Sequence, residues 1–426
     1  MYRAGLGSLR VCKPSILFIN RVFPPDRGAT GRCLYDLAAR FASHGWRVSV
    51  LACGAPDAPS DAPEGVGVTR AGNRIGGSAA GGLGYLSALR RLHHAASRMP
   101  RHDLVVTMTD PPMLAVLGPL LGRRWGCGVI HWSHDLYPDL FPVIGVRLPW
   151  PALSLLRRAA TAALRRCDAV IAIGSCMADR LSDQGIPAQR IVTIPNWSDP
   201  VIRPIPREGN PVRAALGLGG RFTVAYSGNF GLAHPMDAVL DAAFSLAVSA
   251  PDIAMLLIGE GRGLPRVRRA VERNAPKNLR LLPLQPSGTL AASLGAADLH
   301  LAVMDRRAEG MLVPSKVAGA LAAGRPCILL GPTGSAAARM LVENRCGTVL
   351  DPDDGEGLAA AIQSHARDTA FHRAACERAR ATAASWSVDR AADAFLNVAV
   401  SVVRTASGGE TARPSAPSRC MTVGGG

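Results

Sequence analysis

Short apolar runs alternate with helical patterns along nearly the whole chain. In the first half these runs are almost continuous in apolar residues, as in SILFIN at residues 15–20 and LVVTM at residues 104–108. Such runs are typical of strands in a sheet that helices cover on both faces. The pattern predicts strands in the first half at residues 15–20, 46–52, 104–108, 128–132, 168–173 and 190–194.

A helix is predicted at residues 30–43, between the first two strands, and Gly45 ends it. Its apolar positions form one stripe at helical spacing, made of Cys33, Leu34, Leu37, Ala38 and Phe41. Alternation of strands with helices favours parallel sheets that are joined by right-handed crossover connections.

The second half repeats this scheme, with a helix at residues 235–249. Its strands are predicted at residues 222–226, 254–258, 279–282, 298–303 and 326–330. A chain of 426 residues is long enough for two domains of ordinary size. The sequence therefore predicts an α/β fold in which two doubly wound, Rossmann-like parallel-sheet domains face each other across a cleft.

The predicted domain boundaries follow changes in composition. An N-terminal extension is expected at residues 1–14, an N-terminal domain at 15–200, a C-terminal domain at 201–385 and a last helix at 386–404. The composition of residues 405–426 predicts a disordered tail. Residues 54–84 are rich in Gly, Pro and Asp, which favours a mobile loop.

The net charge of +16 and the isoelectric point near 10.2 point to an anionic partner. Basic surfaces attract polyphosphates, anionic membranes and nucleic acids through the same long-range field. The sequence has no zinc-finger spacing and no RNP-like aromatic motif, so no nucleic-acid partner is expected. A membrane surface or a phosphorylated substrate fits the charge, and a plain solvated surface is the alternative.

The chain is expected to be cytoplasmic. Its ten cysteines are scattered singly without a C-x-x-C pair, which argues against a disulfide framework or a metal site. The N-terminus lacks the apolar run of a secretory signal, and no stretch approaches ~20 uninterrupted apolar residues. Residues 140–156 are apolar but interrupted by Arg147 and by prolines. This segment either lies on a membrane, making the protein peripheral on its inner face, or forms an ordinary loop and buried helix.

Two polar segments follow strands of the first half, where doubly wound sheets bind their ligands. After the first strand, Gly28 and Gly31 allow close backbone approach, and the helix start behind them can host an anion. After the fourth strand, HDLYPD carries His134 and Asp135, which could position a substrate hydroxyl or assist its deprotonation. The alternatives are a plain strand-to-helix turn and a capped turn before Pro138.

Two glycine-containing loops follow strands of the second half. The first, YSGNFG, holds Gly228, Asn229 and Gly231 and bares the backbone where a phosphate could sit. The second holds Glu260 and Arg262, where the base or ribose of a nucleotide could lodge. Either loop could instead be a turn without a ligand.

The segment EGMLVPSK carries the strongest functional signal. Ser315 suits a helix N-cap, Lys316 falls in the first helical turn, and Glu309 lies just upstream. A lysine at a helix start is unfavourable unless an anion is nearby, so the pattern indicates a diphosphate site. Gly334 and Ser335 open the next helix and could hold a second edge of the phosphates.

The ordered motifs HDLYPD, IPNW, YSGNFG, VPSK and LAAGRP resemble those of family 4 glycosyltransferases, which have the GT-B fold. The likeness spans residues 15–385 and is strongest to bacterial exopolysaccharide and lipopolysaccharide transferases of the colanic-acid and N-acetylfucosamine type. It implies a retaining transfer, without metal or cofactor, from a nucleotide sugar of UDP or GDP type. It also implies an acceptor such as a polyprenyl-diphosphate-linked glycan.

The resemblance implies a role for several residues by position. Ser315 and Lys316 would bind phosphate in the C-terminal domain, and His134 and Asp135 would border the reaction centre. The glycines at positions 28 and 31 would approach the transferred sugar and the diphosphate. The last helix would cross back to the N-terminal domain.

Two departures from the family pattern leave alternatives open. Many members carry two glutamates where Met311 and Gly319 stand, and an arginine near the position of Leu232. Lys316 with Arg262 would then supply the positive charge. The rival functions are a nucleotide-sugar 2-epimerase of the same fold and a catalytically inactive scaffold that binds nucleotide sugars.

Overall fold

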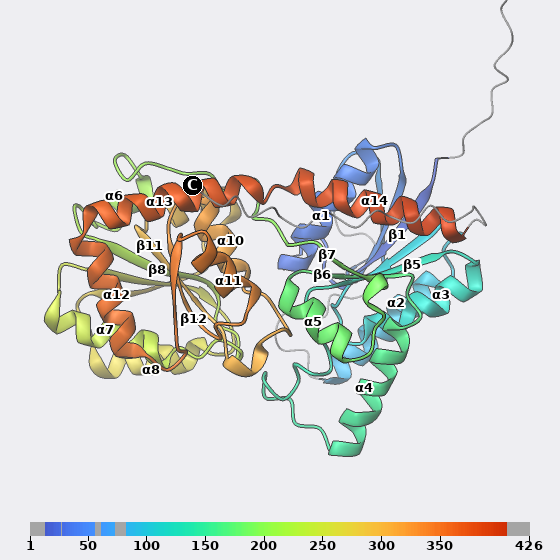
Figure 1. Ribbon diagram of the computed structural model, residues 1–426, viewed down its shortest axis with the longest axis horizontal. Helices are drawn as coiled ribbons and strands as arrows, with labels where there is room; N and C mark the ends of the chain where they lie inside the picture. Colours follow the sequence, from blue (N-terminus) through green and yellow to red (C-terminus); the bar gives the residue numbers. More distant parts are fainter. Residues whose placement is uncertain (1–12, 27, 56–60, 73–81, 407–426) are drawn as a thin grey trace, which may run out of the picture.

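The structure is a computed structural model that describes residues 13–26, 28–55, 61–72 and 82–406. These residues form two sheets of parallel strands, each covered by helices, that lie side by side along the long axis of the molecule (Figure 1). The predicted fold class is confirmed. Residues 1–12 of the expected extension and 407–426 of the expected tail lie outside the described residues.

The first sheet has the strand order β3-β2-β1-β4-β5-β6-β7, and all its pairs are parallel. Its strands are β1 (Ser15–Ile19), β2 (Arg47–Ala52), β3 (Val66–Arg70), β4 (Leu104–Thr107), β5 (Gly128–Ser133), β6 (Ala169–Ala172) and β7 (Ile191–Thr193). The order reverses between β1 and β4. At such a switch point the loops that leave neighbouring strands diverge and open a crevice for ligands.

Helices cover both faces of the first sheet. They are α1 (Ala29–Ser43), α2 (Gly82–Ala96), α3 (Leu117–Trp125), α4 (Trp150–Leu164) and α5 (Ser175–Asp183). On one face the core contains a cluster of aromatic side chains. Phe41 of α1 packs edge-on against Phe18 of β1, with 5.6 Å between the ring centroids. Phe395, near the C-terminus, joins this cluster at 5.9 Å from Phe41 and 5.3 Å from Trp132.

The second sheet has the order β10-β9-β8-β11-β12-β13, again all parallel. Its strands are β8 (Thr223–Asn229), β9 (Ala254–Glu260), β10 (Leu279–Leu282), β11 (Leu299–Val303), β12 (Cys327–Leu330) and β13 (Gly347–Leu350). The helices of this half are α6 (Pro211–Ala215), α7 (Asp237–Ser249), α8 (Leu264–Asn274), α9 (Leu290–Gly295), α10 (Ser315–Ala322), α11 (Ala336–Glu343), α12 (Gly355–Arg367) and α13 (Thr369–Ser385).

The last helix, α14 (Val388–Ala406), continues from α13 and runs over the first sheet (Figure 1). It packs against α1 and β5, and Ala392, Phe395 and Ala399 are buried in the core of the first domain. The helix therefore joins the two halves. The predicted boundary at residues 200 and 201 falls between β7 and α6, and it stays a prediction.

Two strands and two strand ends differ from the predicted pattern. The strand β3 lies inside the predicted loop 54–84; it is a half-exposed edge strand, so its sequence lacks an apolar run. The other edge strand, β13, was not predicted for the same reason. The strands β8 and β9 extend through the glycine loops to Asn229 and Glu260, because these two segments continue the ladder side by side.

A buried ion pair in the second domain connects Arg213 of α6 with Asp298, which directly precedes β11. The guanidinium of Arg213 lies 3.4 Å from the carboxylate of Asp298, and both side chains are 5% exposed. The carboxylate of Asp298 also accepts the backbone N–H of Thr223 at 2.8 Å. Arg213 donates further to the backbone oxygens of Ala296 and Gly219.

We expect Asp298→Ala to lower the free energy of unfolding by about 3 kcal/mol, because it leaves the buried guanidinium of Arg213 without its countercharge and the buried N–H of Thr223 without its acceptor. Urea denaturation followed by circular dichroism measures this loss. The control is Asp351→Ala, which removes an exposed pair with Arg306 and should leave the melting temperature unchanged. Equal losses in the two variants would contradict the structural role of the buried pair.

Candidate active site

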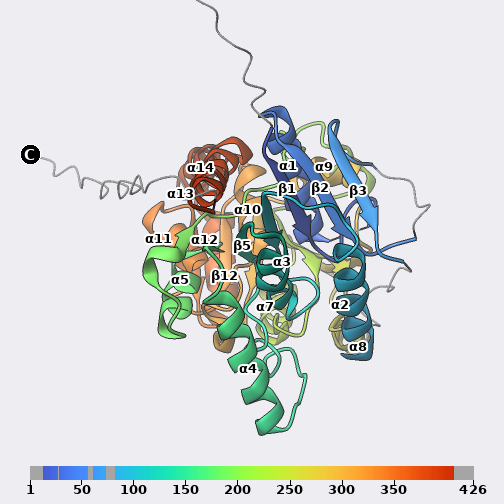
Figure 2. The same ribbon diagram turned by 90° about the vertical axis from the view of Figure 1, so that its right-hand side faces the viewer.

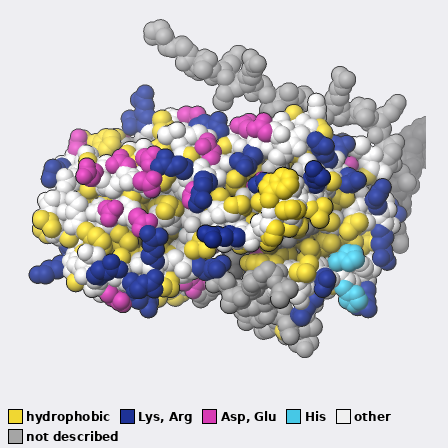
Figure 3. Space-filling model, turned by 90° about the horizontal axis from the view of Figure 1, so that it is seen from below, with side chains coloured by type: hydrophobic (Ala, Val, Ile, Leu, Met, Phe, Trp, Pro, Cys, Tyr) yellow, Lys and Arg dark blue, Asp and Glu magenta, His cyan; other side chains and the backbone are white. Residues whose placement is uncertain are grey.

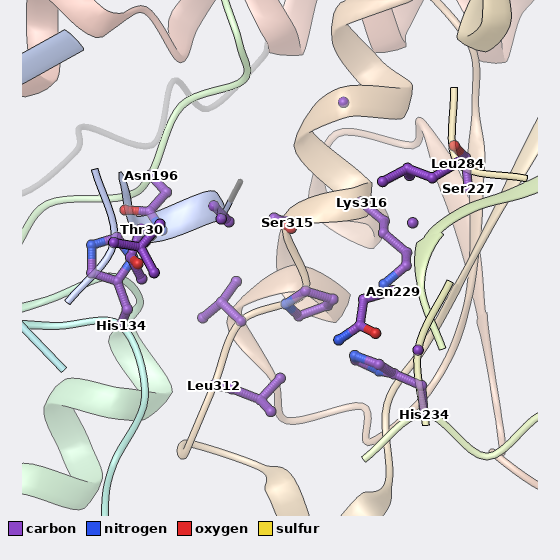
Figure 4. Close-up of a pocket in the computed structure, with 18 of the residues that line it drawn as sticks. Thr30, His134, Asn196, Ser227, Asn229, His234, Leu284, Leu312, Ser315 and Lys316 are labelled. Atoms are coloured by element: carbon purple, nitrogen blue, oxygen red, sulfur yellow. Dashed lines mark hydrogen bonds between the residues drawn. The ribbon is translucent and has the colours of Figure 1, made fainter. Parts of the chain in front are cut away.

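A cavity of about 1110 Å³ lies between the two domains. Its walls come from the loops after β1, β5 and β7 on one side and from β8, β9 and the start of α10 on the other. Figure 4 shows His134, Thr30 and Asn196 on the first side, with Lys316, Asn229 and His234 on the second. The switch point of the first sheet thus faces the carboxyl ends of the second.

Most of the predicted site residues meet in this cavity. The lining includes Gly28, His134, Asp135, Gly228, Asn229, Glu260, Arg262, Ser315 and Lys316. Five predicted residues are not part of the lining: Gly31, Gly231, Glu309, Gly334 and Ser335.

Four of these five residues pack closely against a neighbouring segment or cap a helix, and Glu309 lies beside Gly334. A Cβ at Gly31 would lie 2.9 Å from the backbone oxygen of Val22, and one at Gly231 would lie 3.0 Å from the ring of His234. A Cβ at Gly334 would clash with the carboxylate of Glu309. The Ser335 hydroxyl is buried and accepts the N–H of Ala338 at the start of α11, so it is already used as a helix cap.

Lys316 lies at the start of α10 and is largely enclosed by protein. The helix begins at Ser315 with Pro314 in the cap position, so the prediction that Ser315 caps the helix is wrong. The ammonium lies 4.9 Å from the ring centroid of Tyr226, and burial lowers the pKa of Lys316 to about 8. Among the described residues no carboxylate forms an ion pair with it.

Glycines near the ends of β8 and β9 shape the wall beside this lysine. Gly228 has φ of 135°, and a Cβ there would lie 3.0 Å from Cε of Lys316. A Cβ at Gly259 would clash with the backbone oxygen of Gly228. A larger residue at either position would therefore push the strand ends apart or displace the lysine side chain.

His134 is a buried, neutral hydrogen-bond donor at the opposite wall. Its Nδ1 accepts the side-chain N–H of Asn196 at 3.1 Å, which places the ring proton on Nε2. Burial lowers the pKa of His134 to about 3. The buried Nε2 has no hydrogen-bond partner among the described residues. This favours positioning of a ligand over proton abstraction by this residue.

Asp135 is the titratable carboxyl group beside His134. Burial and the nearby charge of Asp110 raise the pKa of Asp135 to about 7. Asp110 itself is paired with Arg21 at 2.6 Å. A carboxyl group with a pKa near neutrality can accept a proton from a substrate hydroxyl at physiological pH.

The segment that carries Asp135 is attached to the second domain. Its backbone forms an antiparallel bridge with Leu312, and the N–H of Leu136 donates to the oxygen of Met311 at 2.8 Å. Met311 and Leu312 lead directly into α10 and Lys316. The two walls of the cavity are therefore joined at this point.

Sequence reasoning did not assign several polar residues of the lining. Among them, Thr30 and Asn196 line the first wall, and Ser227 and His234 line the second. Asn196 lies within the IPNW motif, which could have indicated it. Its contact with His134 spans 62 positions in the chain and depends on the strand order.

The site combines groups for anion binding with groups for proton transfer. Lys316 and the N–H groups at the start of α10 can bind a phosphate. His134 and Asp135 can hold and deprotonate a hydroxyl across the cavity.

In the described part of the chain no group of three or more His, Cys, Asp or Glu could hold a metal ion. The same part contains no helix that is both long and apolar enough to cross a bilayer.

The chain matches two sequence families and two curated relatives. Residues 28–197 match the glycosyl transferase 4-like domain, and residues 221–368 match glycosyl transferases group 1. The chain is 26% identical over 268 residues to WbjE of Pseudomonas aeruginosa, which is named as a glycosyltransferase; the match covers 62% of this chain and 66% of WbjE. It is 26% identical over 266 residues to WcaI of Escherichia coli, which is named as a colanic acid biosynthesis glycosyl transferase; 61% of this chain and 64% of WcaI are covered. The chain thus spans just under two thirds of the length of these relatives.

Solved structures share the fold at low sequence identity. HepE from Anabaena in complex with UDP superposes with a TM-score of 0.69 at 17% identity, over 91% of this chain and all of the other. Sucrose-phosphate synthase from Thermosynechococcus elongatus superposes with a TM-score of 0.71 at 17% identity, over 91% of this chain and 98% of the other. The solved structures show that the two domains have the GT-B fold. The two sequence families, which together match residues 28–197 and 221–368, show that the chain belongs to the family 4 glycosyltransferases.

Proposed function

We propose that the protein transfers a sugar from a nucleoside diphosphate sugar to a hydroxyl of an acceptor, with retention of the anomeric configuration. The observation that carries this proposal is the Lys316 ammonium, which lies at a helix start in the interdomain cavity with no carboxylate partner among the described residues. A half-buried cation of this kind is stabilised when a diphosphate binds next to it.

The proposed reaction breaks the bond between the anomeric carbon and the diphosphate oxygen, which keeps the electron pair. Lys316 and the N–H groups of α10 stabilise the charge that develops on this oxygen. The acceptor oxygen bonds to the anomeric carbon on the same face, and its proton passes to Asp135. His134 donates through Nε2 and holds a sugar or acceptor oxygen in place.

The donor is proposed to be of UDP or GDP type. HepE, which shares the fold, is described in complexes with UDP and with UDP-glucose. In this chain Glu260 ends β9 and Arg262 follows it, and both line the same cavity. The nucleoside would lie along this edge.

The acceptor is proposed to be a glycan on a polyprenyl diphosphate, at the inner face of the cell membrane. WcaI is named for colanic acid biosynthesis, and WaaG, which shares the fold with a TM-score of 0.65 at 18% identity, is described as involved in lipopolysaccharide biosynthesis. The net charge of +16 suits an anionic membrane surface. A role in surface polysaccharide synthesis follows from these features.

A thermal-shift screen of nucleotides and nucleotide sugars tests the donor site. We expect UDP or GDP at 100 times its Kd to stabilise the fold by about 2.7 kcal/mol, because a ligand that binds only the folded state shifts the unfolding equilibrium. Inorganic phosphate at the same concentration is the control. A flat response to the whole panel would contradict the proposed donor site.

Turnover separates the proposed reaction from its two rivals. Release of nucleoside diphosphate should require an acceptor glycan, and incubation with donor alone should return the donor sugar unchanged. An isomerised sugar in that control would identify a 2-epimerase. Donor binding without turnover over a panel of acceptors would identify a scaffold that binds nucleotide sugars.

A further inference from the structure

The helix α4 projects from the first domain, away from the body of the molecule (Figures 1 and 2). Its first turns are apolar and open to solvent: Trp150 is 74% exposed and Leu155 is 67% exposed. Leu148, just before the helix, is exposed as well. The predicted alternative of an ordinary loop and buried helix at residues 140–156 is therefore wrong for the helical part.

The charged residues in α4 and in the segments on either side of it are all arginines. Between Asp139 and Asp168 the sequence contains no aspartate or glutamate. The same stretch contains five arginines: Arg147, Arg157, Arg158, Arg165 and Arg166. Arg157 pairs with Asp139 at 2.8 Å. Arg147 and Arg158 are exposed and have no ion-pair partner among the described residues, so their charge is available to an outside partner.

The order of the side chains along α4 separates the apolar tip from the cations. Pro151, Leu155 and Arg158 are four and three positions apart, so they lie on one face of the helix. Arg158 follows Leu155 by about 4.5 Å along the helix axis. From below, where α4 points toward the viewer, Figure 3 shows hydrophobic side chains bordered by lysine and arginine side chains.

We propose that the tip of α4 docks into the interface of an anionic phospholipid bilayer. Trp150 and Leu155 enter the boundary between headgroups and acyl chains, and Arg147 and Arg158 contact lipid phosphates. Indole rings favour this depth of a bilayer, and exposed apolar residues next to cations are typical of surfaces that lie on membranes. The proposal locates the membrane contact on the structure and is independent of which donor or acceptor is used.

A second copy of the chain fits this surface less well. A twofold dimer places the same patch on both sides of the interface. The arginines at positions 147 and 158 of both copies would then face each other without acidic residues between them. An anionic bilayer instead offers an apolar interior and negative headgroups in the order that α4 presents.

The test is co-sedimentation of the full chain with phosphatidylcholine vesicles, with and without phosphatidylglycerol. We expect binding to the vesicles that contain phosphatidylglycerol and a decrease of this binding at high salt. Trp150→Ala combined with Leu155→Ser should weaken it by at least about tenfold. Arg147→Gln combined with Arg158→Gln should remove the preference for the anionic lipid.

Matched control variants lie on the second domain. Val248→Ser removes an apolar side chain that is 86% exposed on α7, and Arg268→Gln with Arg269→Gln removes two exposed charges from α8. Both controls should bind vesicles like the unchanged chain. The thermal shift with UDP or GDP should be the same in all variants. This measurement tests the donor site independently of vesicle binding, so the two proposals can fail separately.

Three outcomes would overturn the proposal. The first is an unchanged chain that does not sediment with anionic vesicles. The second is an α4 variant that sediments as well as the controls do. The third is a dimer in light scattering that disappears in the Trp150 and Leu155 variant, because the occupant would then be a second copy.

Discussion

Lys316→Ala should lower kcat/KM by at least about 100-fold while the melting temperature of the free protein does not fall. The variant removes the ammonium that faces the leaving diphosphate and leaves the helix start in place. The lysine gives little to the fold, because it is half-buried and has no carboxylate partner among the described residues. Turnover with saturating acceptor and a thermal melt of the same sample measure both quantities.

The chain offers a close control for this variant. It contains three lysines, and Lys277 is exposed in the same domain, away from the cavity. Lys277→Ala should keep the full activity. Turnover of Lys316→Ala within a factor of a few of the unchanged enzyme would remove this residue from the mechanism.

The pH dependence of donor binding gives a second readout for the same residue. The pKa of Lys316 is lowered to about 8 in the free protein, and a bound diphosphate raises it by favouring the charged form. Donor binding at pH 9 should therefore take up a proton, and the affinity should fall as the pH rises above 8. Calorimetry in buffers of different ionisation enthalpy measures this proton, which should be missing in Lys316→Ala.

Asp135→Asn should lower kcat/KM at pH 8 by about 100-fold, because an amide cannot accept the proton of the acceptor hydroxyl. In the unchanged enzyme the rate should rise with pH around 7, where Asp135 loses its proton. This rise should be absent in the variant. A rise around pH 7 that persists in Asp135→Asn would assign the proton to another acceptor, such as the leaving phosphate.

Stability distinguishes this loss of activity from a loss of fold. The pKa of Asp135 is raised from 3.8 to about 7, so ionisation of this group disfavours the folded state as the pH rises through that range. The asparagine variant avoids this cost and should melt at the same or a higher temperature at pH 8. Asp139→Asn, in the same segment but outside the cavity lining, should keep the pH profile of the unchanged enzyme.

The sequence predicted the buried strands, and it identified His134, Asp135 and Lys316 as candidate site residues. It did not predict the contacts between segments that are distant in the chain. β1 and β4 are buried at every position, so their apolar runs are unambiguous. β3 and β13 are half-exposed edge strands, so their residues carry a weaker signal.

The site shows the same division. Lys316 could be predicted because its conflict with the helix start is local. Asn196 could not be paired with His134, because their contact requires the order of β5, β6 and β7. The roles of the glycines were the hardest to predict. A glycine whose backbone lines a cavity and a glycine that packs against a neighbouring segment cannot be distinguished in the sequence. Gly228 lines the cavity, whereas Gly31 packs against Val22.

The backbone bridge between Asp135 and Leu312 has a mechanical consequence. A hinge motion that moved the second domain away from the first would break the hydrogen bond from Leu136 to Met311 or carry the Asp135 segment along. The segment that follows Met311 ends at Lys316, so the proton acceptor and the cation are connected by a short piece of backbone. In the proposed reaction, opening of the cavity to a nucleotide would therefore also move the carboxyl group that the acceptor meets.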